Sequence, residues 1–155
     1  MISLGFSCWQ VSNRWQKQVC DALKPLELTH VQYLLLKGIA ELNQAKQAAS
    51  QAKVAAYVGT DIMMTSKVCR TLAQKKLIIR ANNRQDTRAK SLIMTHKGAE
   101  LLQAAHPLIS QANLSFFKGL SELERNQLQA LCNAVLASAE VEAVLASKKS
   151  EQITT

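Results

Sequence analysis

Two short helical patterns stand on either side of a single glycine near the middle of the chain. Ser50 is a favoured N-cap residue, and helical spacing continues from it through Tyr57. Gly59 interrupts this spacing, and Thr60 is the predicted N-cap of a second helix over residues 61–75. Two short helices joined by a tight turn that contains glycine form a helix-turn-helix motif. The motif restricts the chain to the few small helical domains that are built around it.

A β-hairpin is predicted directly after the second helix. Residues 77–80 and residues 90–94 are both strand-like, and residues 82–86 between them have the composition of a turn. A hairpin in this position is called a wing, so the pattern as a whole predicts a winged helix-turn-helix.

A further buried helix is predicted before the motif. Thr29 and Gln32 form a T-x-x-Q capping box, which opens a helix to about Leu42. Apolar residues lie nearly all round this helix, so we expect it to be central in the core. A winged helix-turn-helix domain is therefore predicted over residues 29–95.

Long helices with apolar stripes are predicted on both sides of this domain. They occupy residues 3–23 and residues 96–146, with a kink expected at Pro107 and a second capping box from Ser121 to Glu124. Residues 147–155 form a polar tail. The predicted fold class is thus mainly α with a small β-hairpin wing.

The flanking helices are expected to pack against a second copy of the chain. They extend beyond the small winged-helix core instead of completing it, and helices that bury little in their own chain usually bury against another copy. We therefore expect a homodimer, with an intramolecular helical bundle as the alternative.

The net charge of +8 is carried entirely by residues 67–97. This segment holds nine basic residues and one acid, Asp86, while the rest of the chain has ten of each sign. A basic surface of this density is typical of a protein that binds a polyanion. A solvated basic face is the alternative, but the segment crosses a helix, a turn and two strands, which favours a shaped site. The segment is not a basic amphipathic helix, so a membrane partner is not expected.

The cysteines and histidines do not form a pattern that predicts a metal, a cofactor or a disulfide framework. They are widely separated along the chain: Cys8, Cys20, Cys69 and Cys132, and His30, His96 and His106. This usage favours a reducing cytoplasm. Each histidine is expected to be a surface or capping residue, and no catalytic constellation appears, so an enzyme is not expected.

In the order and spacing of these elements, the chain resembles the MarR family of transcriptional regulators over residues 3–146. Residues 61–76 resemble the family's recognition helix, Asp86-Thr87-Arg88 its D-x-R wing signature, and Met94-Thr95-His96-Lys97-Gly98 its L-T-x-x-G motif. One departure is Lys76, which stands where the family commonly has glycine at the end of the recognition helix. The resemblance implies a dimeric, sequence-specific DNA-binding protein on a pseudo-palindromic operator, most often a repressor that a small aromatic or phenolic effector releases.

Candidate DNA contacts lie on the recognition helix and the wing. Arg70 has the guanidinium fork that pairs with guanine, Lys67 and Lys75 suit phosphates, and thymine methyls suit methionine. Arg88 is expected to enter the minor groove, and Asp86 either holds a wing arginine or makes the turn. Arg80 is expected to be structural. The predicted DNA-binding set is Met63, Met64, Thr65, Ser66, Lys67, Arg70, Lys75, Arg84, Asp86, Arg88 and Lys90.

The effector site and the mode of sensing are less constrained by the sequence. Trp9, Trp15 and Tyr33 are candidates to line an effector cleft, although aromatic residues in a helical stripe are more often core. Two alternative functions remain open. One is a winged-helix module that binds an acidic protein, and the other is a thiol-based redox sensor that uses Cys8, although Cys8 lies one helical turn after the family's reactive position, here Gly5.

Overall fold

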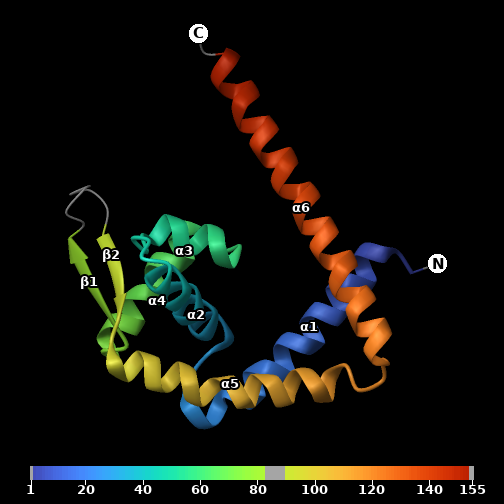
Figure 1. Cartoon of the computed structure of the whole chain (residues 1–155), viewed down its shortest axis with the longest axis horizontal. Helices are drawn as coiled ribbons and strands as arrows, with labels where there is room; N and C mark the ends of the chain where they lie inside the picture. The colour runs from blue at the N-terminus through green and yellow to red at the C-terminus, as the bar shows by residue number, and fades with distance from the viewer. Residues whose placement is uncertain (1, 83–89, 154–155) are drawn as a thin grey trace. The chain divides into compact units, whose positions relative to one another are not determined.

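The computed structural model describes the backbone of residues 2–82 and 90–153, and the side chains of residues 2–81 and 91–139. The chain divides into two compact units, residues 1–114 and residues 115–155. Figure 1 shows the elements, which in chain order are α1 (Leu4–Leu23), a 3-10 turn (Lys24–Leu26), α2 (His30–Gln44), α3 (Gln51–Val58), α4 (Ile62–Gln74), β1 (Ile78–Asn82), β2 (Lys90–Met94), α5 (His96–Phe116) and α6 (Glu122–Ile153). The fold is mainly α with one antiparallel hairpin, which confirms the predicted winged helix-turn-helix class.

Local capping interactions set the ends of the helices around the turn. The capping box of α2 is present, because Thr29 Oγ1 accepts from the Gln32 amide at 3.2 Å and Gln32 Oε1 accepts from the Thr29 amide at 3.1 Å. Gly59 ends α3 at φ +73°, a conformation that costs glycine little. The prediction that Thr60 caps α4 is wrong. The N-cap is Asp61, whose carboxylate accepts from the Met64 amide at 2.7 Å.

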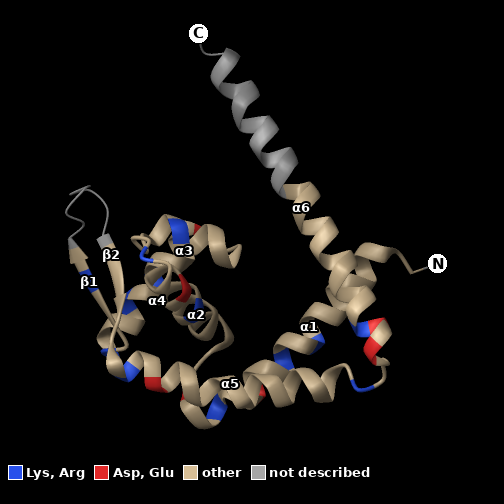
Figure 2. Cartoon of the chain, viewed as in Figure 1, with Lys and Arg blue, Asp and Glu red and all other residues tan. Residues whose placement is uncertain are grey.

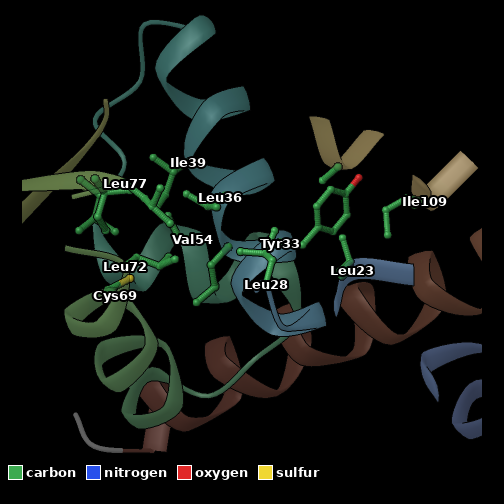
Figure 3. Close-up of a cluster of buried hydrophobic side chains, with 14 of the residues drawn as sticks. Leu23, Leu28, Tyr33, Leu36, Ile39, Val54, Cys69, Leu72, Leu77 and Ile109 are labelled. Atoms are coloured by element: carbon green, nitrogen blue, oxygen red, sulfur yellow. The ribbon is translucent and has the colours of Figure 1, made fainter. Parts of the chain in front are cut away.

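The hydrophobic core is built around α2. Leu35, Leu36 and Ile39 of α2 are fully buried, and they lie in one cluster with Val54 of α3 and Leu72 of α4 (Figure 3). Burial of this many aliphatic side chains is what fixes the short helices α3 and α4, because isolated helices of their length are marginal in water. The prediction that the helix beginning after Thr29 is central is confirmed.

The second strand of the hairpin is hydrogen-bonded to the segment that follows α2. Ile78 pairs with Met94 and Asn82 with Lys90 in an antiparallel register. Across the other edge of β2, the Leu92 amide donates to the Ala49 carbonyl at 2.8 Å. The connection after α2 thus forms an isolated antiparallel bridge to β2, between Ser50 and Ser91, which ties the base of the wing to the helix-turn-helix.

One side chain at the end of α2 strengthens this attachment. Asn43 Nδ2 donates to the Leu92 carbonyl at 3.2 Å, and its Oδ1 accepts from the Met94 amide at 3.1 Å. A side-chain amide that satisfies a donor and an acceptor on one strand mimics a neighbouring strand. The sequence placed Asn43 only in a polar connection and did not indicate this role.

The start of α5 packs directly against the connection between α4 and β1. Thr95 caps the helix by accepting from the Gly98 amide at 3.0 Å, and its hydroxyl lies 2.9 Å from the Leu77 carbonyl oxygen. A Cβ atom on Gly98 would collide with that carbonyl and with the Met94 sulfur. The backbones approach so closely here that only glycine fits. The helix is continuous through Pro107 to Phe116.

The second unit consists mainly of α6. Its predicted capping box is present, since Ser121 Oγ accepts from the Glu124 amide at 3.3 Å and Glu124 Oε2 accepts from the Ser121 amide at 2.7 Å. Residues 147–155, predicted as a tail, continue α6 as far as Ile153. They contain no glycine or proline that would end a helix. In the described part of the chain, no helix is long and apolar enough to cross a membrane.

Candidate nucleic-acid interface

Helix α4 has one buried face and one exposed face. Thr65, Cys69 and Leu72 face the core and are fully buried. The opposite face carries four exposed residues at spacings of three or four, which place them in one line: Met63, Lys67, Arg70 and Gln74. We call these four residues the α4 stripe. Because Lys67 and Arg70 are exposed on one line, the stripe is positively charged and free to contact a partner.

The two methionines of α4 are surface residues. Met63 is 83% exposed and Met64 is 38% exposed. The exposure of Met63 excludes a role in core packing for that residue. An apolar side chain that stands free on a charged helix suits contact with thymine methyl groups in a DNA groove.

The structure contradicts one predicted DNA contact. Thr65 is fully buried, and its hydroxyl donates to the Asp61 carbonyl at 2.8 Å and lies 2.9 Å from the Thr60 hydroxyl. A hydroxyl group with both of these partners inside the protein fixes the turn between α3 and α4. The prediction that Thr65 contacts bases or phosphates is therefore wrong.

Two basic residues end α4: Lys75 has a hydrogen-bond partner within the protein, and Lys76 has an unusual backbone conformation. Lys75 is half-buried, and its Nζ donates to the Glu27 carbonyl at 2.8 Å, which ties α4 to the turn before α2. Lys76 is exposed and has φ +61°. Glycine adopts this left-handed conformation at little cost, whereas a residue with a Cβ atom is strained in it.

Arg70 and Arg80 line one cleft between α4 and the first strand of the wing. The cleft has a volume of about 380 Å³, and its other lining residues are Ala73 and Gln74. Ser66 lies beside it, with its Oγ 3.5 Å from Arg70 Nη2. Figure 2 shows basic residues on both α4 and β1. The sequence predicts a structural role for Arg80, and only the packing of β1 beside α4 brings this residue to the surface of the cleft.

Arg80 has an incompletely paired guanidinium group. Its Nε atom is buried and has no hydrogen-bond partner among the described residues. The positive charge also lies close enough to Cys69 to oppose the effect of burial on that thiol. Burial prevails and raises the pKa of Cys69 to about 11, so this cysteine is a neutral core residue.

The predicted contacts of the wing tip lie mostly outside the described residues. Arg84, Asp86 and Arg88 fall in the connection between β1 and β2, and only the backbone of Lys90 is described. These four residues remain predictions.

The three candidate effector residues are not equivalent. Trp9 is 62% exposed and stacks on Phe6 at 5.9 Å, on the surface of α1. Trp15 is half-buried, and its Nε1 donates to Asn113 Oδ1 at 2.8 Å. Tyr33 is buried in the core between α1 and α5 residues, as Figure 3 shows beside Leu23, and burial raises its pKa. The structure therefore separates Trp9 from the other two.

His30 is a buried residue, which corrects the prediction that all three histidines lie at the surface or in caps. Its ring meets the Trp15 ring edge-to-face with centroids 5.0 Å apart, and burial lowers its pKa. Burial therefore favours the neutral form of the imidazole near pH 7. His96 is exposed and lies 3.4 Å from Glu100, and no cluster of three potential metal ligands occurs among the described residues.

The four cysteines, which include the redox candidate Cys8, differ in exposure. Cys8 and Cys20 are exposed on α1, Cys132 is exposed on α6, and Cys69 is buried. The four thiols are free, and twelve residues of helix separate Cys8 from Cys20, too far for an intrachain disulfide between them.

Comparisons with known proteins identify relatives of the whole fold. No protein-family model matches the chain. The chain is 38% identical to an uncharacterized HTH-type transcriptional regulator, YdcH of Bacillus subtilis. The aligned 122 residues cover 79% of this chain and 83% of YdcH. It superposes on the MepR–DNA complex from S. aureus with a TM-score of 0.78, 24% identity and 89% and 99% of the two chains covered. The corresponding values for CouR from Rhodococcus jostii RHA1, bound to p-coumaroyl-CoA, are 0.74, 25%, 86% and 91%.

Proposed function

The chain belongs to the MarR family of winged-helix transcriptional regulators, and we propose that it is a homodimeric repressor that reads a pseudo-palindromic operator with α4. The observation that carries this proposal is the α4 stripe. A helix fits the major groove of B-DNA, where its side chains reach base edges. Arg70 supplies a bidentate donor for guanine, Lys67 supplies a phosphate contact, and Met63 supplies an apolar surface for thymine methyls.

The wing provides the second part of the proposed contact. Arg84, Arg88 and Lys90 are close in sequence at the connection of the hairpin, with Asp86 among them. An arginine at a wing tip suits a narrow A/T-rich minor groove, whose negative potential attracts a guanidinium group. The hydrogen bonds of Asn43 and Ala49 to β2 support this role, because they fix the base of the wing relative to α4.

The proposed dimer interface is formed by residues 3–23 and 96–146. Large apolar side chains are exposed in both segments, among them Leu4 at 82%, Trp9 at 62%, Leu131 at 66% and Val135 at 68%. Large apolar side chains that recur along exposed helices suit contact with another protein surface. A two-fold axis would present two copies of α4 to successive turns of the DNA, which is why the operator is expected to be pseudo-palindromic.

We further propose that a small aromatic or phenolic molecule releases the DNA. CouR is bound to p-coumaroyl-CoA, and BpsR of Bordetella bronchiseptica is regulated by 6-hydroxynicotinic acid. In this chain Trp15, His30 and Tyr33 lie where α1, α2 and α5 pack together. Small movements in this region would change the position of α2, against which α4 packs. A regulator of this kind acts in the cytoplasm on chromosomal DNA and needs no catalytic residue.

Binding to DNA at several salt concentrations tests the proposal. The probe is the DNA upstream of the protein's own gene, with a shuffled fragment of equal length as the control. If each subunit neutralises three to five phosphates, the slope of log K against log salt is expected to be roughly −5 to −9. Preference for the upstream fragment and a slope in this range support the proposal. A slope near zero on every fragment would instead favour a winged-helix module that binds a protein.

A further inference from the structure

Arg80 is a charged side chain whose position the proposed function does not use. It lies on β1 opposite Leu92, half-buried, and it lines the cleft with Arg70, Ala73 and Gln74. The cleft opens beside the α4 stripe, so a DNA backbone that follows the major groove around α4 would run close to it.

The two arginines make the cleft strongly positive. No ion pair among the described residues involves Arg70 or Arg80. Arginine remains ionised at all relevant pH values, so both residues add positive charge to the lining of the cleft. An anion bound to Arg80 in this cleft of about 380 Å³ would also be stabilised by the charge of Arg70 nearby.

The hydrogen bonding of Arg80 also indicates that an acceptor is missing from the cleft. Its Nε is buried without an acceptor among the described residues. A buried donor that lacks a partner calls for an explanation such as an absent ion or ligand. If Arg80 were purely structural, its guanidinium group would donate to carboxylate or carbonyl oxygens of the protein, as Lys75 Nζ donates to the Glu27 carbonyl.

We propose that the cleft between α4 and β1 binds a phosphate of the DNA backbone, with Arg80 as the principal contact. This inference rests on the proposed DNA-binding function and adds a residue to it. Phosphate is the anion that suits the site, because its tetrahedral oxygens accept bidentate hydrogen bonds from a guanidinium group. A contact of this kind positions α4 in the groove and carries no sequence information. Arg80 thus fixes the depth and angle at which Arg70 meets a base.

The test compares Arg80→Met with Lys46→Ala. Methionine keeps an unbranched side chain and removes the charge, while Lys46 is an exposed lysine after α2, outside the proposed DNA contacts and dimer interface, that no described carboxylate contacts. Affinities for the upstream DNA and for the shuffled fragment are measured by fluorescence anisotropy over a series of salt concentrations. Melting temperatures are recorded for each variant, and Arg80→Lys serves as a second variant that retains the charge.

Loss of one phosphate contact in each subunit is expected to reduce the magnitude of the salt slope by about 1.8 for Arg80→Met. At 0.1 M salt the affinity is expected to fall roughly ten- to sixtyfold, by the same factor for both fragments. Arg80→Lys should recover most of the slope, and Lys46→Ala should leave it unchanged.

Three outcomes would overturn the inference. The slope of Arg80→Met could equal that of the native protein, its loss of affinity could be confined to the upstream fragment, or Arg80→Lys could bind as weakly as Arg80→Met with the same reduced slope. Each of these results requires a native protein that binds DNA, so each contradicts the Arg80 site alone. If the native protein showed no salt-dependent binding to either fragment, the proposed function itself would fail.

Discussion

Lys76 occupies the left-handed position that ends α4. The Leu77 amide donates to the Leu72 carbonyl and the Lys76 amide to the Ala73 carbonyl, each at 2.9 Å, which is the hydrogen-bond pattern of a Schellman motif. The motif requires a positive φ, which is +61° at Lys76. An L-residue pays for this conformation with close contact between its Cβ and its own backbone.

Lys76→Gly is therefore expected to stabilise the fold by roughly 1 kcal/mol, as measured by urea denaturation. Lys76→Ala is the matched control. It removes the same charge and keeps the Cβ, so the free energy of unfolding should stay near that of the native protein or fall. Equal stabilisation by both variants would show that charge repulsion, not backbone strain, is relieved at this position.

Single residues also show which features the sequence could reveal. The capping boxes at Thr29 and Ser121 depend on a few neighbouring residues, so the spacing of residue types was enough to predict them. The burial of Thr65, the strand contacts of Asn43 and the cleft position of Arg80 depend on elements that meet only in the folded chain. Periodicity along one helix cannot show which of two polar faces another element covers.

At the scale of elements, the first turn of α5 packs against the base of the β-hairpin without free space between them. Gly98 lies in the first turn of α5, where a Cβ would collide with the Leu77 carbonyl and the Met94 sulfur. The base of the wing and the start of α5 are therefore held in one arrangement, and α5 leads directly from the DNA-binding unit toward the proposed dimer interface.

Gly98→Ala is expected to lower the free energy of unfolding by about 2 kcal/mol, because overpacking outweighs the gain in helix propensity. Gly5→Ala in α1 is the control, since a Cβ there meets no atom within 4 Å. It should be neutral or stabilise the fold by up to ~1 kcal/mol. Thermal unfolding followed by circular dichroism measures both. An unchanged midpoint for Gly98→Ala would mean that α5 and the hairpin separate readily.

The elements themselves were predicted well, with errors at their ends. Gly59 marks the turn of the helix-turn-helix clearly, and the turn composition of residues 82–86 marks the connection of the hairpin. The start of α4 was misplaced by one residue, because Thr60 and Asp61 are both good N-caps and only the hydrogen bond to the Met64 amide distinguishes them. The predicted end of α6 is too early, because residues 147–155 are polar but contain no residue that would end a helix.

At the scale of the whole molecule, the proposed dimer determines how two recognition helices reach one DNA. Leu131 and Val135 are exposed four residues apart on α6, in one line along the helix. Replacing both with glutamate is expected to give monomers or aggregates by light scattering, because charges would enter an apolar interface.

The matched control replaces Gln129 with glutamate and Asn133 with aspartate. These two residues are also exposed and four apart, and their variant adds the same charge to a different face of α6. It is expected to remain a dimer. The proposed interface is wrong if the Leu131 and Val135 variant is a well-folded dimer as well.

Recognition of a base by Arg70 is the step on which the proposed function depends most. The measurement is the affinity of the native protein and of Arg70→Ala for the operator and for operators with single base-pair substitutions, with melting curves for both proteins. Arg70 is exposed, so the melting temperature should change little. Loss of the side chain is expected to cost about 1–3 kcal/mol at the operator and to abolish discrimination at one position in each half-site. An equal loss of affinity for every sequence would contradict base reading by α4, and loss of binding through unfolding would place the DNA surface elsewhere.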